Sequence, residues 1–552
     1  MTATFSAGKR TDVLHEMANA HFDILIIGGG ITGAGIALDA ASRGLKTALV
    51  EMQDFAAGTS SRSTKLIHGG LRYLKQFEVK MVAEVGRERA VVYENGPHVT
   101  TPEPMLLPIY KTGTFGRLST SIGLMVYDRL AGVKYSERRR MLNARAVSDM
   151  EPLLRRQELL GGGLYVEYRT DDARLTIEVM KEAVSRGAQA INYVKADGFI
   201  KKDGKVVGIQ ATDQLDGRTC MLHADKVINA SGPWVDRLRE LDGSRQGKTL
   251  QLTKGIHLVF DGKRFPLRQA VYFDTPDGRM VFAVPRDGKT YVGTTDTVYK
   301  DDPAHPLIDD SDREYVLEAI RNMFPDVRVT AEDVESAWAG VRPLIHEEGK
   351  GPSEISRKDE VWVSRSGLIT IAGGKLTGYR KMAEMVVDLA ARQLEEETGR
   401  SAGPCITKRL PISGGDVGGS AGYAVYAERK IKDGVALGLE RAVAERLVRT
   451  YGSNVDRLYA RLSGLRGRSE VHGMPIELFL MASYAMEEEM AATPADFWVR
   501  RTGALFFRIG EVRQWKGAVA AYMSQVLHWT EEQASHYGEE LDRLLSEVSF
   551  RR

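Results

Sequence analysis

The feature that most constrains the fold of this chain is a glycine turn near its N-terminus. A short apolar run, residues 22–27, ends in Gly28-Gly29-Gly30-Ile31-Thr32-Gly33, which has the GxGxxG spacing. The run suits a buried parallel strand, and a predicted helix over 31–43 follows it and ends at Gly44. A second predicted strand, 46–50, leads to Glu51. The segment therefore predicts a Rossmann-type βαβ unit that binds a dinucleotide.

Each glycine of this motif has a physical role. We expect Gly28 to form the tight turn, Gly30 to let the backbone approach a pyrophosphate, and Gly33 to let helix and strand pack closely. The helix N-terminus then faces the anion. Glu51 is placed to accept a hydrogen bond from a ribose 2′-hydroxyl, and its charge would repel a 2′-phosphate. The motif therefore favours FAD or NAD over NADP, without deciding between the first two.

A second dinucleotide motif is not evident. The run Gly161-Gly162-Gly163 lacks the later glycine that the motif requires. A two-nucleotide reductase of the disulfide type is therefore disfavoured.

Length and charge narrow the class of protein further. A chain of 552 residues, 43% apolar and 27% charged, is expected to form about two to four globular domains. Lys and Arg number 76 and Asp and Glu 74, a balance that argues against a nucleic-acid partner. The two cysteines, Cys220 and Cys405, have neither disulfide-framework nor metal-ligand spacing. We therefore expect no metal site and a reducing, cytoplasmic setting.

Membrane insertion is not predicted. The first twenty residues have no apolar run long enough for a signal peptide, and the most apolar stretch, 24–41, holds five glycines and Asp39. Peripheral contact with the inner face of a membrane stays open, although no amphipathic basic helix stands out.

A polar stretch, residues 56–73, follows the βαβ unit. It is dense in small hydrogen-bonding residues and contains Thr59, Ser60, Ser61 and the pair Gly69-Gly70. Hydroxyls and free backbone amides can satisfy phosphate and ribitol oxygens, and adjacent glycines let a flat ring approach the main chain. From composition alone a flexible surface loop is an equally good interpretation.

Together with Gly373-Gly374-Lys375-Leu376-Thr377-Gly378-Tyr379-Arg380-Lys381, this stretch resembles the FAD-dependent glycerol-3-phosphate dehydrogenase family. The resemblance is to the aerobic, respiratory type of Gram-positive bacteria, and it extends from about residue 22 through 494–502. The segments 168–174, 229–234, 253–257, 293–296 and 340–344 agree with the family pattern.

The family implies an α/β multidomain fold: a Rossmann-type FAD-binding domain, an antiparallel-sheet substrate domain and a C-terminal helical domain. Turn signals at 261–262, 277–278 and 287–288 support an antiparallel sheet over 254–295. Capping patterns at Thr493 and at Thr530 with Gln533 indicate helices near the C-terminus. The expected segments are 1–98, 166–245 and 341–395 for the FAD domain, 99–165 and 246–340 for the substrate domain, 396–422 for a linker and 423–552 for the helical domain.

The expected cofactor contacts come from the βαβ unit, the polar stretch and two later glycine turns. They are Gly28, Gly30, Ile31, Thr32, Gly33, Glu51, Met52, Thr59, Ser60, Ser61, Lys65, Leu66, His68, Gly69, Ala230, Gly232, Gly374, Lys375, Leu376 and Thr377.

The resemblance also implies a substrate, sn-glycerol 3-phosphate, and a hydride transfer from its C2 to the flavin. A phosphate needs fixed cations, and the planar fork of Arg suits it. The expected substrate contacts are Arg72, Tyr73, Arg342, Arg357 and Lys375.

Proton removal needs a base near neutrality, for which histidine is the natural candidate. Of the eleven histidines, His68 and His257 lie in motif-like surroundings, although a histidine beside apolar residues is more often a packed core residue. Arg342 or Lys375 could stabilise the developing alkoxide. Sequence alone does not separate base from stabiliser.

Two alternatives remain. A related glycerol-3-phosphate oxidase would pass electrons to oxygen, but the extra insertion of such oxidases is not evident, which favours a membrane quinone as acceptor. A non-catalytic FAD-binding protein would keep the fold without the reaction. A homodimer is possible, and its helices could pack through the apolar face of the last predicted helix.

Overall fold

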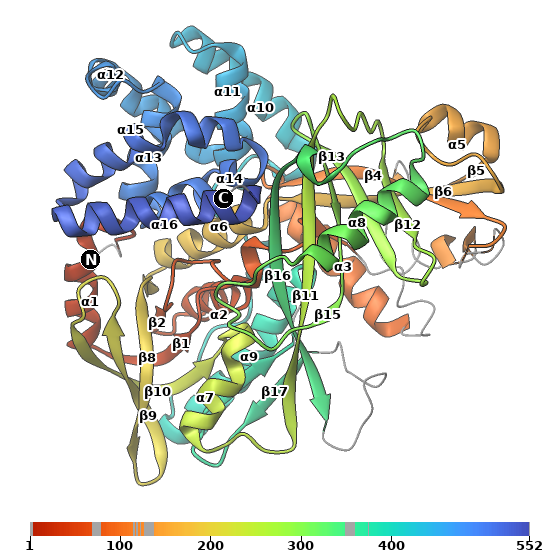
Figure 1. The fold of residues 1–552 in the computed structure, drawn as a ribbon. Coiled ribbons are helices and arrows are strands. Elements are labelled where there is room, and N and C mark those ends of the chain that lie inside the picture. The colour runs from red at the N-terminus through yellow and green to blue at the C-terminus, as the bar shows by residue number, and fades with distance from the viewer. Residues whose placement is uncertain are drawn as a thin grey trace.

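Two β-sheets and a group of C-terminal helices make up the protein (Figure 1). The computed structural model describes residues 4–68, 79–113, 116, 120–121, 123–125, 137–347, 359–373 and 375–550. In Figure 1 the C-terminal helices (blue) lie above the first sheet, and the second sheet extends to the other side. This arrangement agrees with the predicted α/β multidomain class.

The first sheet has a parallel core formed by segments from distant parts of the chain. Its core order is β18 (Ile369–Ala372), β10 (Thr219–Asn229), β1 (His21–Ile27), β2 (Thr47–Val50) and β7 (Gln189–Ile191). Antiparallel additions are β17 (Glu360–Val363) on β18 and the hairpin β8 (Val194–Lys202) and β9 (Lys205–Asp213) on β10. Ile27 is in register with both Asn229 and Val50, so three strands end at one edge. Loops at that edge of a parallel sheet are where ligands bind.

The predicted βαβ unit is confirmed to within one residue at each boundary. β1 is buried from Phe22 onward, as its apolar run predicts, and α2 (Ile31–Ser42) begins after Gly30. Gly44 then has a φ of 83°, the left-handed conformation that glycine supplies after a helix. α2 packs against α6 (Asp172–Ser185) and α9 (Tyr379–Thr398), which buries it on both sides.

The second sheet is almost wholly antiparallel. Its order is β15 (Thr297–Val298), β11 (Lys248–Asp261), β14 (Lys289–Gly293), β13 (Met280–Arg286), β12 (Ala270–Asp274), β4 (Thr100–Tyr110), β6 (Leu159–Thr170) and β3 (Leu66–Ile67), with β16 (Val334–Glu347) on β11 and β5 (Arg140–Asn143) on β6. Only the β12–β4 pair is parallel among the described residues. The antiparallel sheet predicted over 254–295 is therefore confirmed, and strands from 100–170 extend it.

Further helices pack on both sheets, the first of them against β10 and β7 of the first sheet. They are α1 (Arg10–Ala18), α3 (Val79–Asn95), α5 (Ala144–Met150), α7 (Val235–Asp242) and α8 (Asp310–Met323). α8 covers one face, where Val316 and Ile320 join a core with Leu258 and Val292. The other face shares a core with the C-terminal helices, to which Tyr291 contributes.

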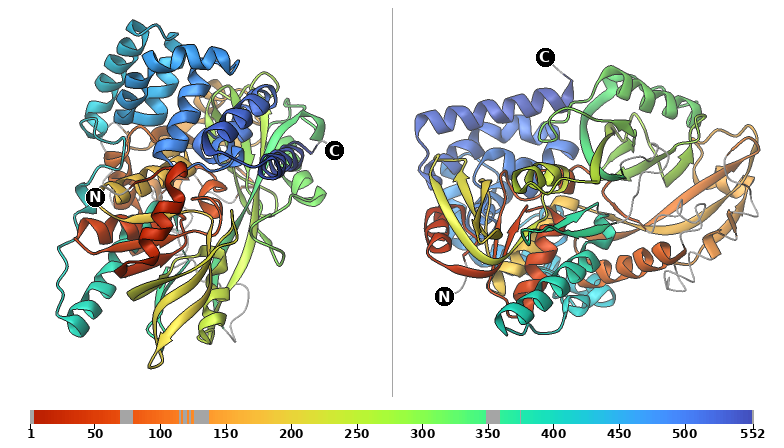
Figure 2. Two further views of the ribbon diagram at one scale, coloured as in Figure 1. Left: turned by 90° about the vertical axis from the view of Figure 1, so that its left-hand side faces the viewer. Right: turned by 90° about the horizontal axis from the view of Figure 1, so that it is seen from below.

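The C-terminal domain is helical, as predicted. It contains α10 (Gly419–Ala436), α11 (Arg441–Tyr451), α12 (Val455–Val471), α13 (Ile476–Glu488), a π-helix (Asp496–Arg501), α14 (Ala504–Phe507), α15 (Ile509–Leu527) and α16 (Glu531–Ser549). Thr530 and Gln533 form the predicted capping box of α16. Figure 2 shows these helices from two further sides, packed against the rest of the fold, where they contact α6 and β16.

The expected segment boundaries differ from the observed elements at four points. β3 belongs to the second sheet although it lies inside 1–98, β6 extends beyond 165, and β16 extends beyond 340. Within the expected linker, 396–422, Ile412 is buried, and α10 already begins at Gly419. These shifts arise because sheet pairing between distant segments decides where a strand belongs. No helix among the described residues is long and apolar enough to cross a bilayer.

Candidate active site

A large cavity lies between the two sheets. Its volume is about 1180 Å³, somewhat above the usual range of about 300–1,000 Å³ for small-molecule sites. The carboxyl ends of β1, β2 and β10 border it on one side, and β11, β13 and β16 on the other. It can therefore hold a long ligand against the first sheet and a small one against the second.

The glycine turn forms one wall of this cavity. Gly28 has a φ of 118°, and a Cβ there would lie 2.5 Å from the Ala230 carbonyl oxygen, so only glycine fits. A Cβ at Gly33 would lie 1.8 Å from the Gly28 oxygen. Gly33 does not line the cavity and contributes by packing α2 against the turn.

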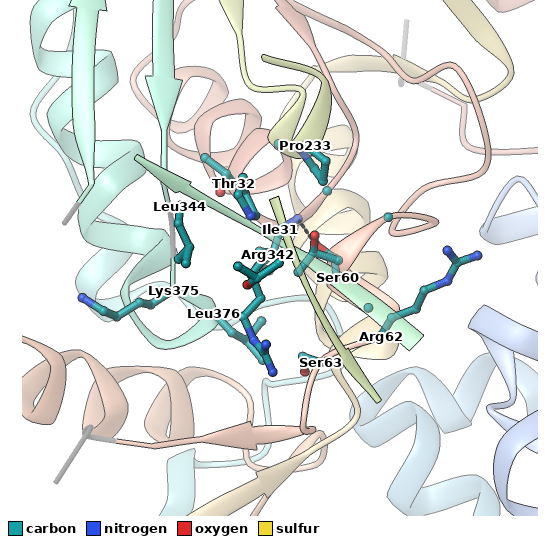
Figure 3. Close-up of a pocket in the computed structure, with 18 of the residues that line it drawn as sticks. Ile31, Thr32, Ser60, Arg62, Ser63, Pro233, Arg342, Leu344, Lys375 and Leu376 are labelled. Atoms are coloured by element: carbon teal, nitrogen blue, oxygen red, sulfur yellow. Dashed lines mark hydrogen bonds between the residues drawn. The ribbon is translucent and has the colours of Figure 1, made fainter. Parts of the chain in front are cut away.

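The N-terminus of α2 opens on the cavity. Gly30 occupies the cap position without a side chain to bond the first amides, and the Ile31 N–H donates to Ser60 Oγ at 2.9 Å (Figure 3). Ile31 and Thr32 line the cavity. Backbone donors and the positive end of the helix dipole thus face the space where a pyrophosphate would lie.

Glu51 holds the turn from the next strand. Its Oε2 accepts from the Gly29 N–H at 2.7 Å, and its Oε1 accepts from the Gln53 N–H at 2.8 Å. Burial raises the pKa of this carboxyl, although the two backbone donors oppose the shift. Glu51 and Met52 both line the cavity, the position expected of a ribose-binding acid.

The described part of the polar stretch after Glu51, residues 56–68, is a fixed wall rather than a flexible loop. Thr59 Oγ1 donates to the Val341 oxygen at 2.6 Å, which ties the stretch to β16. Thr59, Ser60, Leu66 and His68 line the cavity.

Two residues that were expected to contact the cofactor, Lys65 and Ser61, point away from the cavity. The Lys65 ammonium donates to Asp172 Oδ1 at 2.6 Å and to the Ser61 oxygen at 2.9 Å, and it lies 5.3 Å from the centre of the Trp338 ring. Neither Lys65 nor Ser61 lines the cavity, and both are buried. The left-handed φ of 57° at Lys65 turns its side chain away, toward the N-terminus of α6. The Lys65 side chain therefore ties the loop to Asp172 and does not border the cavity.

Arg342 is the best-defined cation of the cavity. Its Nη2 donates to Thr294 Oγ1 at 2.9 Å, and its Nη1 donates to the Thr295 oxygen at 3.2 Å and to Asp296 Oδ1 at 3.4 Å. Its side chain is 31% exposed. Figure 3 shows the guanidinium directed to the side where Leu376 and Ser63 lie, whereas Lys375 points the opposite way.

Two glycines that face each other across β11 and β16 make room at this place. Gly255 pairs with Gly340. A Cβ at Gly255 would lie 2.2 Å from Arg342 Nη2, and one at Gly340 would lie 2.2 Å from the Arg62 oxygen. The Arg342 guanidinium and the Arg62 backbone therefore approach the sheet closely at these two glycines.

His257 lies in the floor of the cavity and is 1% exposed. Its ring stacks on Trp338 with centroids 4.7 Å apart, and Nε2 is 3.1 Å from Thr64 Oγ1. Nδ1 is buried without a protein partner. Burial, with added repulsion from Arg342 and Lys65, lowers the pKa of His257 well below 6.5, so the ring is neutral at neutral pH.

The other expected residues reach the same cavity from the polar stretch and from the two later glycine turns. His68 borders it beside Phe282, with ring centroids 6.1 Å apart, and its carbonyl oxygen accepts from Thr377 Oγ1 at 3.1 Å. Ala230, Gly232, Lys375, Leu376 and Thr377 also line it. Gly69, Arg72, Tyr73, Arg357 and Gly374 lie outside the described residues.

Some cavity residues have no local sequence signal. Tyr165, Tyr272 and Phe282 form an aromatic wall and come from three separate strands. Tyr272 and Phe282 stack with centroids 4.2 Å apart. Arg62 also borders the cavity, but its guanidinium extends away from Arg342 in Figure 3 and donates to the Ala304 oxygen at 3.0 Å. Only the 293–296 segment, which the family pattern singled out, pointed to the groups that hold Arg342.

Comparison with known families gives the class of the protein. The family described as "FAD dependent oxidoreductase" matches residues 23–380, and "C-terminal domain of alpha-glycerophosphate oxidase" matches residues 405–534. The first match covers well over half of the chain. Fold and comparison together define an FAD-dependent oxidoreductase.

Individual relatives narrow the class. The chain is 61% identical to an aerobic glycerol-3-phosphate dehydrogenase of Bacillus subtilis over 99% of both chains, and 56% identical to one of Staphylococcus haemolyticus over 98% of this chain and 97% of the other. A crystal structure of the glycerol-3-phosphate dehydrogenase of Bacillus halodurans, complexed with FAD, is 50% identical, with a TM-score of 0.87 and 99% of each chain covered. The chain belongs to the family of aerobic glycerol-3-phosphate dehydrogenases.

Proposed function

We propose that this protein oxidises sn-glycerol 3-phosphate to dihydroxyacetone phosphate with FAD as its cofactor. The observation that carries the proposal is one cavity that joins a dinucleotide turn to a fixed arginine, in a chain 61% identical to an aerobic glycerol-3-phosphate dehydrogenase. The turn suits a pyrophosphate, and the arginine suits the phosphate of a small substrate.

The chain has suitable groups for the dinucleotide. Gly28, Gly30 and the first amides of α2 leave space and donors for the pyrophosphate. Glu51 borders the same cavity as an acceptor for a ribose hydroxyl. Ser60, Ala230 and Leu376 complete the walls. The donor set and the missing side chains therefore fit FAD.

The substrate's phosphate is assigned to Arg342. A phosphate monoester carries close to two negative charges at neutral pH, and a guanidinium fork held by Thr294 and Thr295 presents it with a preoriented cation. The proposal also keeps Arg72, Tyr73, Arg357 and Lys375 as substrate contacts, on the resemblance to the family.

Proton removal from the substrate hydroxyl is assigned to His68. Both histidines border the cavity, but His257 is buried, close to Thr64 Oγ1, and its pKa is lowered by burial, so His68 is the better placed of the two to accept a proton. His257 then supports the floor by stacking on Trp338. Bound FAD supplies the two-electron acceptor, and the chain supplies orientation and charge. Arg342 also offers positive charge to a developing alkoxide.

We further propose that the electrons pass to a membrane quinone and that the protein works in the cytoplasm, in contact with the inner face of the membrane. The word "aerobic" in the names of the relatives supports a respiratory acceptor. The resemblance of residues 405–534 to a domain named for an oxidase makes oxygen the competing acceptor. A homodimer remains part of the proposal.

The test is an anaerobic titration of the purified protein with sn-glycerol 3-phosphate, followed in the visible spectrum. Bleaching of a bound flavin band supports cofactor and substrate together. A flavin that stays oxidised in excess substrate refutes the substrate and favours a non-catalytic FAD-binding protein. Turnover with a soluble quinone but not with oxygen then supports the dehydrogenase over the oxidase, and the reverse result refutes the quinone assignment.

A further inference from the structure

The loop between Glu51 and Gly58 has two faces. Glu51, Met52 and Ala57 line the cavity. Between them, Asp54 and Phe55 are buried on the side away from it. The loop therefore stands between the cofactor site and whatever packs behind it.

The buried side of this loop supports the glycine turn. The Ala56 N–H donates to the Gly29 oxygen at 3.0 Å. A Cβ at Gly29 would lie 2.6 Å from Phe55 Cδ1, so the Phe55 ring sets the closest approach of the turn. Ala56 has a φ of 64°, a left-handed conformation that a residue other than glycine keeps only when its surroundings fix it. The position of the turn thus depends on what fixes the loop.

Two arginines of the C-terminal domain converge on this loop at Asp54. Arg501 binds the carboxylate in a bidentate manner, with Nη1 to Oδ2 at 2.8 Å and Nη2 to Oδ1 at 2.9 Å. Arg500 Nε donates to Oδ2 at 2.5 Å, and Asn192 Nδ2 donates to Oδ1 at 2.9 Å. The side chains of Asp54 and Arg501 are both fully buried. Each carboxylate oxygen of Asp54 therefore accepts two hydrogen bonds.

The arginines are fixed by their own domain. They lie at the end of the π-helix, where the Thr502 N–H donates to the Phe497 oxygen at 3.0 Å. Arg501 Nη2 also donates to the Glu489 oxygen at 2.7 Å, and Arg500 Nη2 donates to Asp496 Oδ1 at 2.7 Å. Single π-turns of this kind are frequent at functional sites because they re-aim side chains.

Charge keeps the contact intact. Burial by itself would raise the pKa of Asp54, but the Arg501 and Arg500 guanidinium groups outweigh it and hold that pKa below its usual range. Asp54 is therefore ionised wherever the protein is folded at neutral pH, and its bonds to both arginines are charge-assisted.

We propose that Arg500 and Arg501 are positioning residues for the dinucleotide turn, so that FAD binding and docking of the π-helix stabilise each other. The inference rests on the proposed use of FAD. The path runs from the C-terminal domain through Asp54 to Phe55 and Ala56, and from there to Gly29. Because coupling between two sites is reciprocal, weakening the arginine contact lowers FAD affinity, and FAD protects the π-helix.

The first test measures FAD binding to protein stripped of its flavin, by flavin fluorescence. We expect Arg501→Gln to raise the Kd for FAD at least tenfold, and Arg501→Lys, which keeps the charge but loses the fork, to recover part of that loss. The double variant Asp54→Asn/Arg501→Gln should raise the Kd for FAD by less than the product of the two single-variant increases, because both substitutions remove the same contact.

Two controls separate positioning from general destabilisation. Arg441→Gln removes an arginine of the same domain that pairs with Glu428 at the surface, and should change the Kd less than twofold. Leu458→Ala opens a cavity in the fully buried core of α12, distant from Asp54, and should lower the melting temperature without a matching loss of FAD affinity. The proposal is overturned if Leu458→Ala and Arg501→Gln have the same melting temperature and also lose the same FAD affinity.

Hydrogen exchange of the unaltered protein gives a second test that needs no variant. FAD should slow amide exchange in 496–502 as well as in 28–33 and 51–60. Protection confined to 28–33 and 51–60 overturns the coupling. Failure of the unaltered protein to bind FAD at all refutes the proposed function instead, so the two failures are distinguishable.

Discussion

A methyl group at Gly255 would test whether the position of Arg342, rather than its charge alone, binds the substrate. The added Cβ of Gly255→Ala would lie 2.2 Å from Arg342 Nη2 and 2.4 Å from Thr294 Oγ1. Ordinary contact begins near 3.4 Å, so the guanidinium must move by about 1 Å. The clashing atoms belong to side chains, and the long Arg342 side chain can move while the sheet itself remains intact.

The expected loss follows from the bonds that the movement breaks. A hydrogen bond that involves a charged group contributes about 1.5–3 kcal/mol, and a 1 Å misplacement of a binding group can lower a rate about 100-fold. We therefore expect kcat/KM for sn-glycerol 3-phosphate to fall about 30- to 150-fold, or about 2–3 kcal/mol. FAD affinity should stay within twofold, because Gly255 faces the second sheet's side of the cavity.

Steady-state kinetics under saturating acceptor, with flavin content measured in parallel, provide the assay. Gly198→Ala is the matched control, because Gly198 also lies in a strand and its nearest neighbour to an added Cβ is 3.6 Å away. An unchanged kcat/KM in Gly255→Ala would refute the assignment of the phosphate to Arg342 in its observed position. A large loss in Gly198→Ala would show instead that any strand methyl disturbs the enzyme.

Three further predictions concern the turn, an internal histidine and the pH profile. Gly33→Ala places a Cβ 1.8 Å from a backbone oxygen, so the purified variant should contain no flavin, as the absorbance ratio at 450 and about 280 nm would report. Burial lowers the pKa of His98 to about 4, so the unfolded chain binds a proton at a higher pH than the folded protein does. The free energy of unfolding should therefore fall by about 3 kcal/mol as the pH drops from 6.5 toward 4. Urea unfolding at several pH values should show this dependence, and His98→Phe should remove it. His257→Asn should leave the acid limb of the kcat/KM pH profile in place, because His257 is already neutral there; a shifted limb would contradict its assignment as a supporting residue.

The first sheet was predictable because its signals are local. The apolar run, the GxGxxG turn and Glu51 lie within about 30 consecutive residues, the length of one βαβ unit. At Gly33 a clash with the nearby Gly28 oxygen requires glycine, whereas at Gly28 the requirement comes from a φ of 118° and from Ala230 in a distant part of the chain. The capping box at Thr530 was equally local.

The setting of Arg342 was not predictable in this way. Its position depends on Gly255 in β11 and on Thr294 and Asp296 in the connection between β14 and β15, and sequence spacing does not report which segments lie side by side. The resemblance to the family selected the arginine, but not the reason that it is held there. The same limit explains Lys65, whose place in a polar stretch suggested a ligand contact while its backbone turns it toward Asp172.

The order in which the chain supplies its strands has a consequence for biosynthesis. The strands that border the cofactor side come from residues 21–50, 189–229 and 360–372, and Thr377 closes the cavity after the last of them. A ribosome adding about 5–20 residues per second must therefore work for tens of seconds before the complete site can exist, and longer before Arg501 reaches Asp54. During that interval the first βαβ unit lacks the neighbouring strands of its sheet, which are synthesised later. Flavin is then a late addition to a nearly finished chain, and its supply in the cell acts on the last stage of maturation.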